Sequence, residues 1–212
     1  MIEKENKDIS VDEIVTQLIK KTKNGGGDSD KHLMTFFSLV LGSESKTIVE
    51  LGVRNGDSTL PLTLGAYHND GHVYSVDINK SEYVLPKVLS DNQTFHKGDA
   101  IEFLENWDKT KPIDLVYVDD WHSYEHVKRE LEILDSLVSP NTIIILHDLM
   151  YGNTCPFYHS DLTESAGGQW SHGGPYRAVA ELNPQFWEFS TLPYNNGLTI
   201  LRKKYSNLYK QK

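Results

Sequence analysis

Apolar residues recur with helical spacing near the start of the chain. Between Ser10 and the glycine run that begins at Gly25, they lie on one face of a predicted helix. Ser10 and Glu13 have the spacing of a capping box, which marks the beginning of that helix. A second helix is expected after Asp28 or Ser29, because either residue is a suitable N-cap and the apolar spacing resumes beyond them.

From residue 47 onward, short runs rich in β-branched residues alternate with helical segments. The expected strands are residues 47–53, 72–78, 93–98, 113–119 and 142–146. The expected helices between them are residues 57–66, 81–90, 100–107 and 124–137. Pro86 weakens the second of these helices, because an interior proline loses a backbone hydrogen bond. Alternating strands and helices predict a parallel sheet that is covered on both faces.

The last part of the chain departs from this alternation. A long loop over residues 150–176, rich in Gly, His, Tyr and Ser, is followed by an expected helix over residues 175–182. Residues 186–192 and 198–202 then have strand character, and the five residues between them are typical of a hairpin turn. The pattern therefore predicts a seven-stranded, mostly parallel sheet that ends in an antiparallel hairpin.

Length and charge limit the classes of protein to consider. The 212 residues suit one domain, here divided into an N-terminal helical segment, 1–44, and a main domain, 45–212. The formal net charge of −9 argues against nucleic acids or anionic membranes as partners. The chain has no signal-peptide pattern, no apolar stretch long enough to span a bilayer, and one cysteine, Cys155. We expect a cytoplasmic location.

The first expected strand leads into a loop that contains Gly52 and Gly56. Ligands of open α/β sheets bind beyond the carboxyl ends of the strands, and glycine allows the backbone to turn sharply and to approach a ligand closely. Asp57 or Ser58 can cap the helix that follows. The loop is therefore a candidate binding site, with a tight structural turn as the alternative interpretation.

Acidic residues follow the next two expected strands. Asp77 ends the second strand, where a carboxylate can accept hydrogen bonds from the hydroxyls of a ribose. Asp99 and the backbone amide of Ala100 follow the third strand and could bind the edge of an adenine. Helix capping is an alternative role for both carboxylates, and for Asp99 the two roles fit equally well.

Together these motifs resemble the three cofactor motifs of class I S-adenosylmethionine (SAM)-dependent methyltransferases. The resemblance covers about residues 47–203 and includes the closing hairpin, which implies their Rossmann-like fold. It places Glu50, Gly52 and Gly56 near the methionine part of SAM, Asp77 at the ribose and Asp99 at the adenine. The implied cofactor-binding residues are Glu50, Gly52, Arg54, Asn55, Gly56, Ser58, Asp77, Asp99, Ala100 and Asp119.

Arg54 stands where many members of that family have glycine. A side chain has to fit at this position, so we expect a wider loop. Because SAM carries no phosphate, we expect Arg54 to act through backbone geometry and not through phosphate binding.

Polar residues also follow the fourth and fifth expected strands. Asp119 and His122 follow the fourth strand, and His147 and Asp148 follow the fifth. Neighbouring parallel strands bring such residues to one edge of the sheet, where carboxylates and imidazoles suit a divalent cation. A cation there would lower the pKa of an acceptor hydroxyl, and a nearby histidine could take its proton. The alternative is that Asp148 caps the next segment and Asp119 accepts backbone amides.

This second pattern resembles the cephalosporin-hydroxylase-like and macrolide-sugar O-methyltransferases and, more distantly, catechol O-methyltransferase. The resemblance implies that Asp119, His147 and Asp148 hold Mg²⁺ or another divalent cation, and that His122 is the base, with Asp119 also catalytic. His147 departs from the carboxylate or amide that these enzymes have at its position, which leaves the identity of the metal open.

The leading hypothesis is metal-assisted O-methylation of a small hydroxylated acceptor, such as a sugar or a natural product. The alternatives are a SAM-dependent methyltransferase without a metal, a non-catalytic SAM-binding module and, less consistent with the glycine spacing, an NAD-dependent oxidoreductase. Homo-oligomerisation is left open. The candidate acceptor-pocket residues in the long loop are Tyr151, Tyr158, His159, Trp170 and His172.

Overall fold

The computed structural model describes residues 9–150 and 174–205 and contains a single β-sheet within them. Its strands are β1 (Thr47–Leu51), β2 (His72–Asp77), β3 (Gln93–Lys97), β4 (Leu115–Val118), β5 (Ile143–His147), β6 (Trp187–Leu192) and β7 (Leu198–Lys203). Their order across the sheet is β3-β2-β1-β4-β5-β7-β6. Strands β1 to β5 pair in parallel, whereas β7 is antiparallel to both β5 and β6. The predicted parallel sheet and closing hairpin are confirmed.

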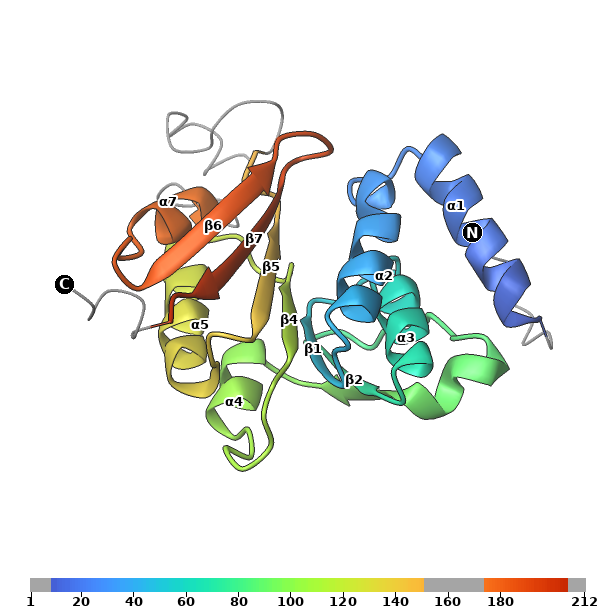
Figure 1. Cartoon of the computed structure of the whole chain (residues 1–212), viewed down its shortest axis with the longest axis horizontal. Helices are drawn as coiled ribbons and strands as arrows, with labels where there is room; N and C mark the ends of the chain where they lie inside the picture. The colour runs from blue at the N-terminus through green and yellow to red at the C-terminus, as the bar shows by residue number, and fades with distance from the viewer. Residues whose placement is uncertain (1–8, 151–173, 206–212) are drawn as a thin grey trace.

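Helices cover both faces of this sheet (Figure 1). One layer contains α1 (Val11–Asn24), α2 (Leu33–Gly42) and α3 (Thr59–His68), and the other contains α4 (Ala100–Glu105), α5 (Tyr124–Leu137) and α7 (Gly174–Ala180). Short 3₁₀ helices span Asp30–His32 and Lys87–Asn92. The resulting architecture is the three-layer α/β arrangement that the alternation of strands and helices predicts.

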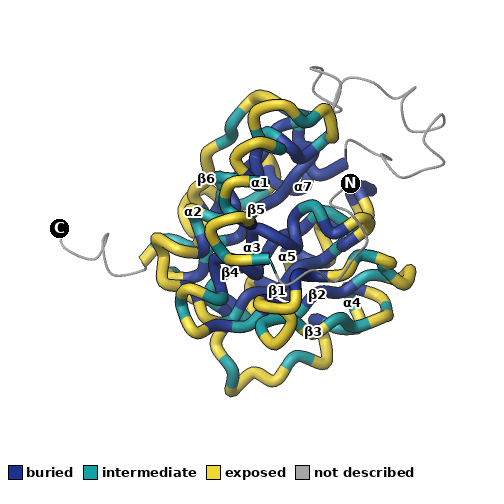
Figure 2. The backbone as a smooth tube through the Cα atoms, turned by 90° about the vertical axis from the view of Figure 1, so that its right-hand side faces the viewer, coloured by how far each residue is buried: buried dark blue, intermediate teal, exposed yellow. Residues whose placement is uncertain are grey.

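Successive residues of the central strands supply two hydrophobic clusters, one on each face of the sheet. Ile48 packs in the cluster with α1, α2 and α3, and Val49 packs in the cluster with α4, α5 and α7. This division follows from the alternation of side chains along a strand. The central strands are therefore buried in Figure 2, and their carboxyl ends provide a rigid base for the loops that follow.

Two local predictions are wrong. The segment 81–90 is not a helix: its chain is irregular until the 3₁₀ helix that begins at Lys87, and Pro86 is extended, with ψ of 139°. Asp28 and Ser29 do not cap α2, because the 3₁₀ turn Asp30–His32 comes first and Ser29 makes no capping bond. The capping box of Ser10 and Glu13 at α1 is confirmed.

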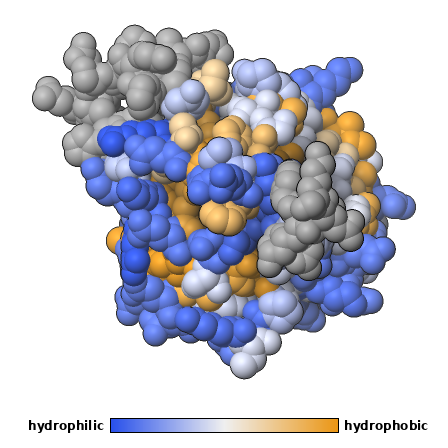
Figure 3. All heavy atoms as spheres, turned by 60° about the vertical axis from the view of Figure 1, so that its left-hand side comes forward, coloured by the Kyte–Doolittle hydropathy of each residue, from blue (hydrophilic) through white to orange (hydrophobic). Residues whose placement is uncertain are grey.

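The surface is mainly hydrophilic on the face seen in Figure 3, with smaller apolar areas between polar side chains. The exposed large apolar residues include Phe186, which precedes the edge strand β6, and Phe189, which lies within it. Within residues 9–150 and 174–205, no helix is both long and apolar enough to cross a membrane.

Candidate active site

The loop between β1 and α3 has a backbone that requires glycine at two positions. Gly52 has φ of +89° and Gly56 has φ of +75°, a region that residues with a Cβ rarely adopt. A Cβ at Gly52 would overlap the carbonyl oxygen of Asp119 at the end of β4, and a Cβ at Gly56 would overlap the ring of Tyr83. At both glycines, therefore, the backbone closely approaches other parts of the protein, namely Asp119 and Tyr83.

Asp77, at the end of β2, holds this loop in place. Its Oδ2 accepts hydrogen bonds from the backbone amides of Val53 and Arg54, both at 2.9 Å, and its Oδ1 accepts one from Asn79 at 2.8 Å. The carboxylate therefore has a structural role in the loop. Two carboxylate oxygens offer about four lone-pair sites, so these three bonds still leave acceptor capacity for a ribose hydroxyl.

Glu50 lies under the same loop and is fully buried. Ser58, Thr59 and Ser75 donate hydrogen bonds to its carboxylate at 2.6, 3.0 and 2.5 Å. Burial raises the pKa of Glu50, the three hydroxyls partly offset this effect, and the resulting pKa is about 7. Glu50 therefore joins β1, β2 and the start of α3, and would influence a bound cofactor through the position of the loop.

The raised pKa of Glu50 predicts a pH-dependent stability. Because the folded chain retains this proton at a pH where the unfolded chain loses it, the contribution of Glu50 to stability is fully present below pH 4.5 and is lost as the pH rises towards 7. We expect the wild type to lose up to about 3 kcal/mol relative to Glu50→Gln across this window. Denaturant unfolding of both proteins between pH 4 and about 8 measures the difference. Parallel curves for the two proteins would contradict the assignment.

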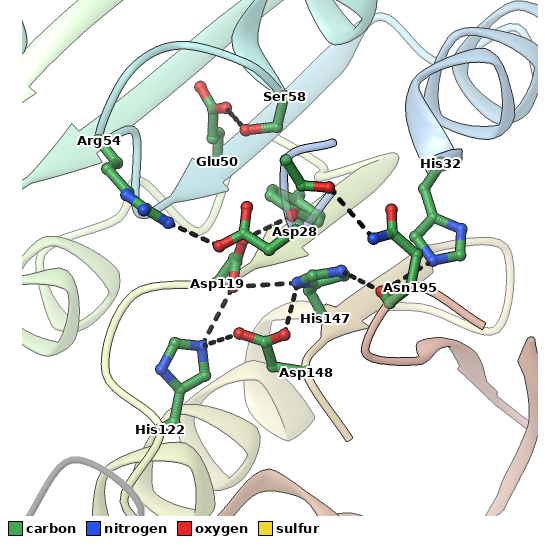
Figure 4. A network of polar contacts seen from close by, with 12 residues as sticks. Asp28, His32, Glu50, Arg54, Ser58, Asp119, His122, His147, Asp148 and Asn195 are labelled. Atoms are coloured by element: carbon green, nitrogen blue, oxygen red, sulfur yellow. Dashed lines mark hydrogen bonds and ion pairs between the residues drawn. The ribbon is translucent and has the colours of Figure 1, made fainter. Parts of the chain in front are cut away.

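Arg54 extends from the loop into solvent, where it pairs with Asp28 at 2.7 Å (Figure 4). Its backbone has φ of +47°, so the arginine adopts a conformation that suits glycine better. We expect Arg54→Gly to change the free energy of unfolding by less than about 1 kcal/mol, because an exposed ion pair contributes little and the backbone strain is relieved. SAM affinity should be largely retained. Thermal unfolding and a SAM titration measure both, and a tenfold loss of affinity would indicate a direct role for the guanidinium group.

The other predicted cofactor residues lie around the loop and at the start of α4. Asn55 is exposed in the loop, whereas Ser58 is buried at the N-cap position of α3 with its hydroxyl directed to Glu50. Asp99 caps α4 by accepting the backbone amide of Glu102 at 2.9 Å. Ala100 is the first residue of α4 and is buried. Capping of α4 by Asp99 is thus present, and its contact with adenine stays a prediction.

Asp119, His122, His147 and Asp148 meet at the carboxyl ends of β4 and β5 (Figure 4). The Nε2 atom of His122 lies 3.1 Å from Asp119 Oδ1 and 3.2 Å from Asp148 Oδ2. The Nδ1 atom of His147 lies 3.6 Å from Asp119 Oδ1 and 3.1 Å from Asp148 Oδ1. The four side chains expected to share one edge of the sheet therefore form a single cluster.

The end of β5 explains how two successive residues face the same cluster. Side chains alternate along a strand, but β5 ends at His147, and Asp148 adopts the left-handed region with φ of +64°. On β4, the hydroxyl of Tyr117 donates to Asp119 Oδ2 at 2.7 Å and fixes that carboxylate. The cluster is therefore positioned by strand ends and not by flexible loop tips.

Opposite charges stabilise the ionised forms of these groups. Burial opposes charge on His147, but the carboxylates of Asp119 and Asp148 outweigh it and raise the pKa of His147 to about 11. The same balance raises the pKa of His122. Burial also opposes ionisation of Asp119, yet the two imidazoles hold its pKa below the usual range. Two imidazolium groups can thus neutralise two carboxylates here.

The cluster also has the properties of a cation site. The ligand atoms of Asp119, His122 and Asp148 all lie within 4.8 Å of one another. Among the described residues, Asp148 Oδ1 and His147 Nδ1 are buried without a hydrogen-bond partner, because their mutual contact lacks hydrogen-bond geometry. Buried polar atoms without hydrogen bonds are costly, and carboxylate and imidazole donors suit Mg²⁺, Mn²⁺ or Zn²⁺. The residues present therefore fit a divalent cation.

Two further residues contribute to this cluster although no local sequence pattern indicates them. The Nε2 atom of His147 contacts the carbonyl oxygen of Asn195 at 3.1 Å, in the turn between β6 and β7. His32 is fully buried, lies edge-on to the ring of His147 and stacks on Tyr194. The Asn195 side chain accepts the amide of Lys31 at 2.9 Å. The turn of the hairpin thus connects the N-terminal segment to the cluster.

A small pocket opens beside the cluster, and Asp119, Trp121, His122, His147 and Pro175 are among the residues that line it. Trp121 is 46% exposed, so an apolar ring borders the pocket on the solvent side. The five acceptor-pocket candidates in the loop 150–176 lie outside the described residues.

Comparison with protein-family models matches residues 49–149 to a methyltransferase domain family. The matched segment runs from β1 to the residue after Asp148. It therefore includes the glycine loop and the cluster of Asp119, His122, His147 and Asp148. Comparison with curated protein sequences gave no significant match.

Several solved structures share the fold. The O-methyltransferase from Bacillus cereus in complex with SAH has 19% identity and a TM-score of 0.64, over 96% of this chain and 93% of that chain. TomG is an O-methyltransferase of Streptomyces achromogenes involved in tomaymycin synthesis. Its structure in complex with SAM has 15% identity and a TM-score of 0.65, over 94% of this chain and 92% of that chain. MycE of the mycinamycin biosynthetic pathway, in complex with Mg and SAH, has 15% identity and a TM-score of 0.63, over 95% of this chain and 56% of that chain.

These findings confirm the resemblance to class I methyltransferases. Residues 49–149 match the methyltransferase domain family, and the chain shares the fold of the solved methyltransferases, with the sheet order and closing hairpin that the resemblance implied.

Proposed function

We propose that this chain is a SAM-dependent O-methyltransferase that acts on a small hydroxylated acceptor, such as a sugar or a natural product, with the assistance of a divalent cation. One observation carries the proposal. The carboxylates of Asp119 and Asp148 and the imidazoles of His122 and His147 meet at the edge of the sheet, directly beside the glycine loop. Two O-methyltransferases with the same fold, and the methyltransferase MycE in complex with Mg, support it.

SAM would bind over the loop at Gly52 and supply the methyl group. Asp77 holds the loop amides in place and has acceptor capacity left for the ribose hydroxyls. Ligands in open α/β sheets bind at this end of the strands, so SAM bound here would bring its methyl group near the cluster. The buried carboxylate of Glu50 supports the loop from below.

Asp119 and Asp148 would hold the cation, together with His147. The contact of His147 Nε2 with the Asn195 carbonyl favours a proton on Nε2, which leaves Nδ1 as the coordinating atom in the neutral ring. A divalent cation at this position supplies positive charge that favours ionisation of an acceptor hydroxyl.

His122 borders the pocket and is the proposed base. Its neutral imidazole would accept the proton of the acceptor hydroxyl, and Asp119, 3.1 Å from Nε2, would stabilise the resulting imidazolium. The acceptor oxygen forms a bond to the methyl carbon while the bond from that carbon to the sulfur of SAM breaks. The products are the methyl ether and S-adenosylhomocysteine, with the proton on His122.

A metal-independent methyltransferase is the second candidate. One observation favours it: His147 lies within 3.6 Å of both carboxylates and has a pKa raised to about 11, so protonated His147 can offset part of their charge without a cation and leave His122 neutral as the base. In that case His122 alone would activate the acceptor. Methyl transfer from radiolabelled SAM to a panel of sugars and phenols, with Mg²⁺ and after exhaustive chelation, separates the two candidates. Equal rates would favour the second candidate.

Asp77→Ala tests the cofactor part of the proposal. We expect the variant to bind SAM more weakly by about 1–3 kcal/mol, because it loses charge-assisted hydrogen bonds to the ribose and to the loop. Calorimetric titration of SAM measures the change, and Asp91→Ala, an exposed carboxylate in the 3₁₀ helix after Pro86, is the control. Unchanged affinity in Asp77→Ala would exclude Asp77 from the cofactor site, and preferential binding of NAD would exclude the proposed function.

A further inference from the structure

A second group of metal-ligating side chains lies beside the four-residue cluster of the candidate active site, and one of its members, Asp120, also lines the adjoining pocket. Asp120 follows β4, and His126 and Glu130 are in the first two turns of α5. The Nε2 atom of His126 lies 2.8 Å from Asp120 Oδ2 and 3.6 Å from Glu130 Oε1. One ligand atom from each of the three residues lies within 4.8 Å of the other two. This set, Asp120, His126 and Glu130, is called the α5 cluster below.

Glu130 is the member of the α5 cluster that needs a ligand. Its side chain is fully buried, and neither carboxylate oxygen has a hydrogen-bond donor among the described residues. Asp120 Oδ1 is likewise buried without a partner. Leaving buried polar atoms unpaired costs about 1–3 kcal/mol each, and more for a charged group. Three buried carboxylate oxygens without a hydrogen-bond donor, beside a single imidazole, therefore indicate that this cluster binds further positive charge.

The protein itself supplies little positive charge at this point. Arg129, the basic residue next to Glu130, pairs with Glu105 at 2.6 Å and with Glu132 at 3.6 Å on the exposed surface of α5. Within the described residues, Asp120 and Glu130 both form ion-pair contacts with His126. One imidazolium cannot neutralise two carboxylates, and burial together with the charge of Asp120 raises the pKa of Glu130 to about 8. Near neutral pH Glu130 therefore keeps a proton, which a bound cation would displace.

The arrangement of the three ligands suits a divalent transition metal. His126 and Glu130 are four residues apart, which places both on one face of α5, and Asp120 approaches from the loop. One imidazole and two carboxylates resemble the donor sets of Zn²⁺ sites with an open position, whereas Mg²⁺ and Ca²⁺ prefer oxygen ligands alone. The Asp120 and His126 side chains are 18% and 16% exposed, which gives an ion access from solvent.

We propose that Asp120, His126 and Glu130 form a second divalent-cation site, which takes Zn²⁺ in preference to Mg²⁺. It would stabilise the loop between β4 and α5. That loop carries Asp119 and His122, and the backbone of Asp120 packs directly against Gly52. The site is therefore structural. It adjoins the candidate active site, because Asp120 also lines the pocket there, but it does not depend on the proposed methyl transfer.

Zinc binding to the full-length chain tests this proposal. Asp148→Asn first weakens the active-site cluster, so that the α5 cluster can be measured alone. Equilibrium dialysis against Zn²⁺, followed by elemental analysis, should give one zinc per chain for Asp148→Asn. Adding Glu130→Gln should reduce zinc binding at least tenfold, and adding Glu132→Gln, a change at an exposed neighbour on α5, should leave it unchanged.

A second measurement covers the case in which the buried Glu130→Gln change impairs folding. Asp120→Asn, at a partly exposed position, should abolish the rise in melting temperature that Zn²⁺ produces in Asp148→Asn, and an equal concentration of Mg²⁺ should produce a smaller rise. The proposal is overturned if Asp148→Asn binds no zinc, or if folded Glu130→Gln or Asp120→Asn retains it. In those cases protonated His126 is the resident counter-ion.

Discussion

Asp119→Asn is expected to lower the turnover number by about 10²–10⁴-fold, the range typical for the loss of general acid-base assistance. The carboxylate lies 3.1 Å from His122 Nε2 and 3.6 Å from His147 Nδ1, so its charge affects both imidazoles. Asparagine keeps the size of the side chain and one oxygen for the Tyr117 hydroxyl, but it cannot stabilise an imidazolium or hold a cation with equal strength. Steady-state rates with a methyl-accepting substrate measure the effect.

A control variant and a second measurement test whether the loss of turnover is specific to Asp119. Asp135→Asn changes an exposed carboxylate on α5 that pairs with Lys203, and we expect it to leave turnover unchanged. SAM affinity of Asp119→Asn should change far less than turnover, because Asp119 acts mainly on the acceptor side. A turnover number for Asp119→Asn within threefold of wild type would show that Asp119 has no catalytic role.

Gly52→Ala is expected to weaken SAM binding by more than about 100-fold, because at least two separate effects oppose the methyl group. The backbone at φ of +89° is unfavourable for alanine, and the added Cβ would overlap the carbonyl oxygen of Asp119 and the Cα of Asp120. The loop or the end of β4 has to move, and the two parts of the site would then separate. Titration with SAM and thermal unfolding measure the two consequences.

Gly42→Ala is the matched control for this variant. A Cβ at Gly42, the last residue of α2, would meet no atom within 4 Å, and alanine favours a helix more than glycine does. We expect normal SAM binding and equal or slightly higher stability. Normal binding in Gly52→Ala as well would contradict the close packing of the glycine loop on β4.

The order of strands and helices could be predicted because each central element has a clear pattern. Residues such as Val116 and Ile144 lie in continuous apolar runs that only a fully covered sheet can bury. The predicted helix at residues 81–90 failed for a tertiary reason. Asn79 and Ser81 bond to Asp77 and Arg54, and the ring of Tyr83 packs on Gly56, so the segment follows the glycine loop and not its own propensity.

The active-site cluster could be predicted because its four residues lie at the ends of two neighbouring strands or in the few residues that follow them. His32 could not, because its contact with His147 joins positions more than 100 residues apart and depends on the turn at Asn195. The α5 cluster offered a partial signal, since His126 and Glu130 have i, i+4 spacing. That spacing is common on exposed helix faces, and the burial of Glu130, which distinguishes this pair, is evident only in the folded chain.

A crystal of the chain grown with S-adenosylhomocysteine and Mn²⁺ tests the central claim most directly. The account predicts the cofactor over the loop at Gly52, with its ribose hydroxyls bonded to Asp77. It also predicts an anomalous peak within about 2.0–2.6 Å of carboxylate oxygens from both Asp119 and Asp148. A cofactor bound elsewhere would contradict the assigned SAM site, and manganese absent from these two carboxylates at saturating concentration would contradict metal-assisted methyl transfer.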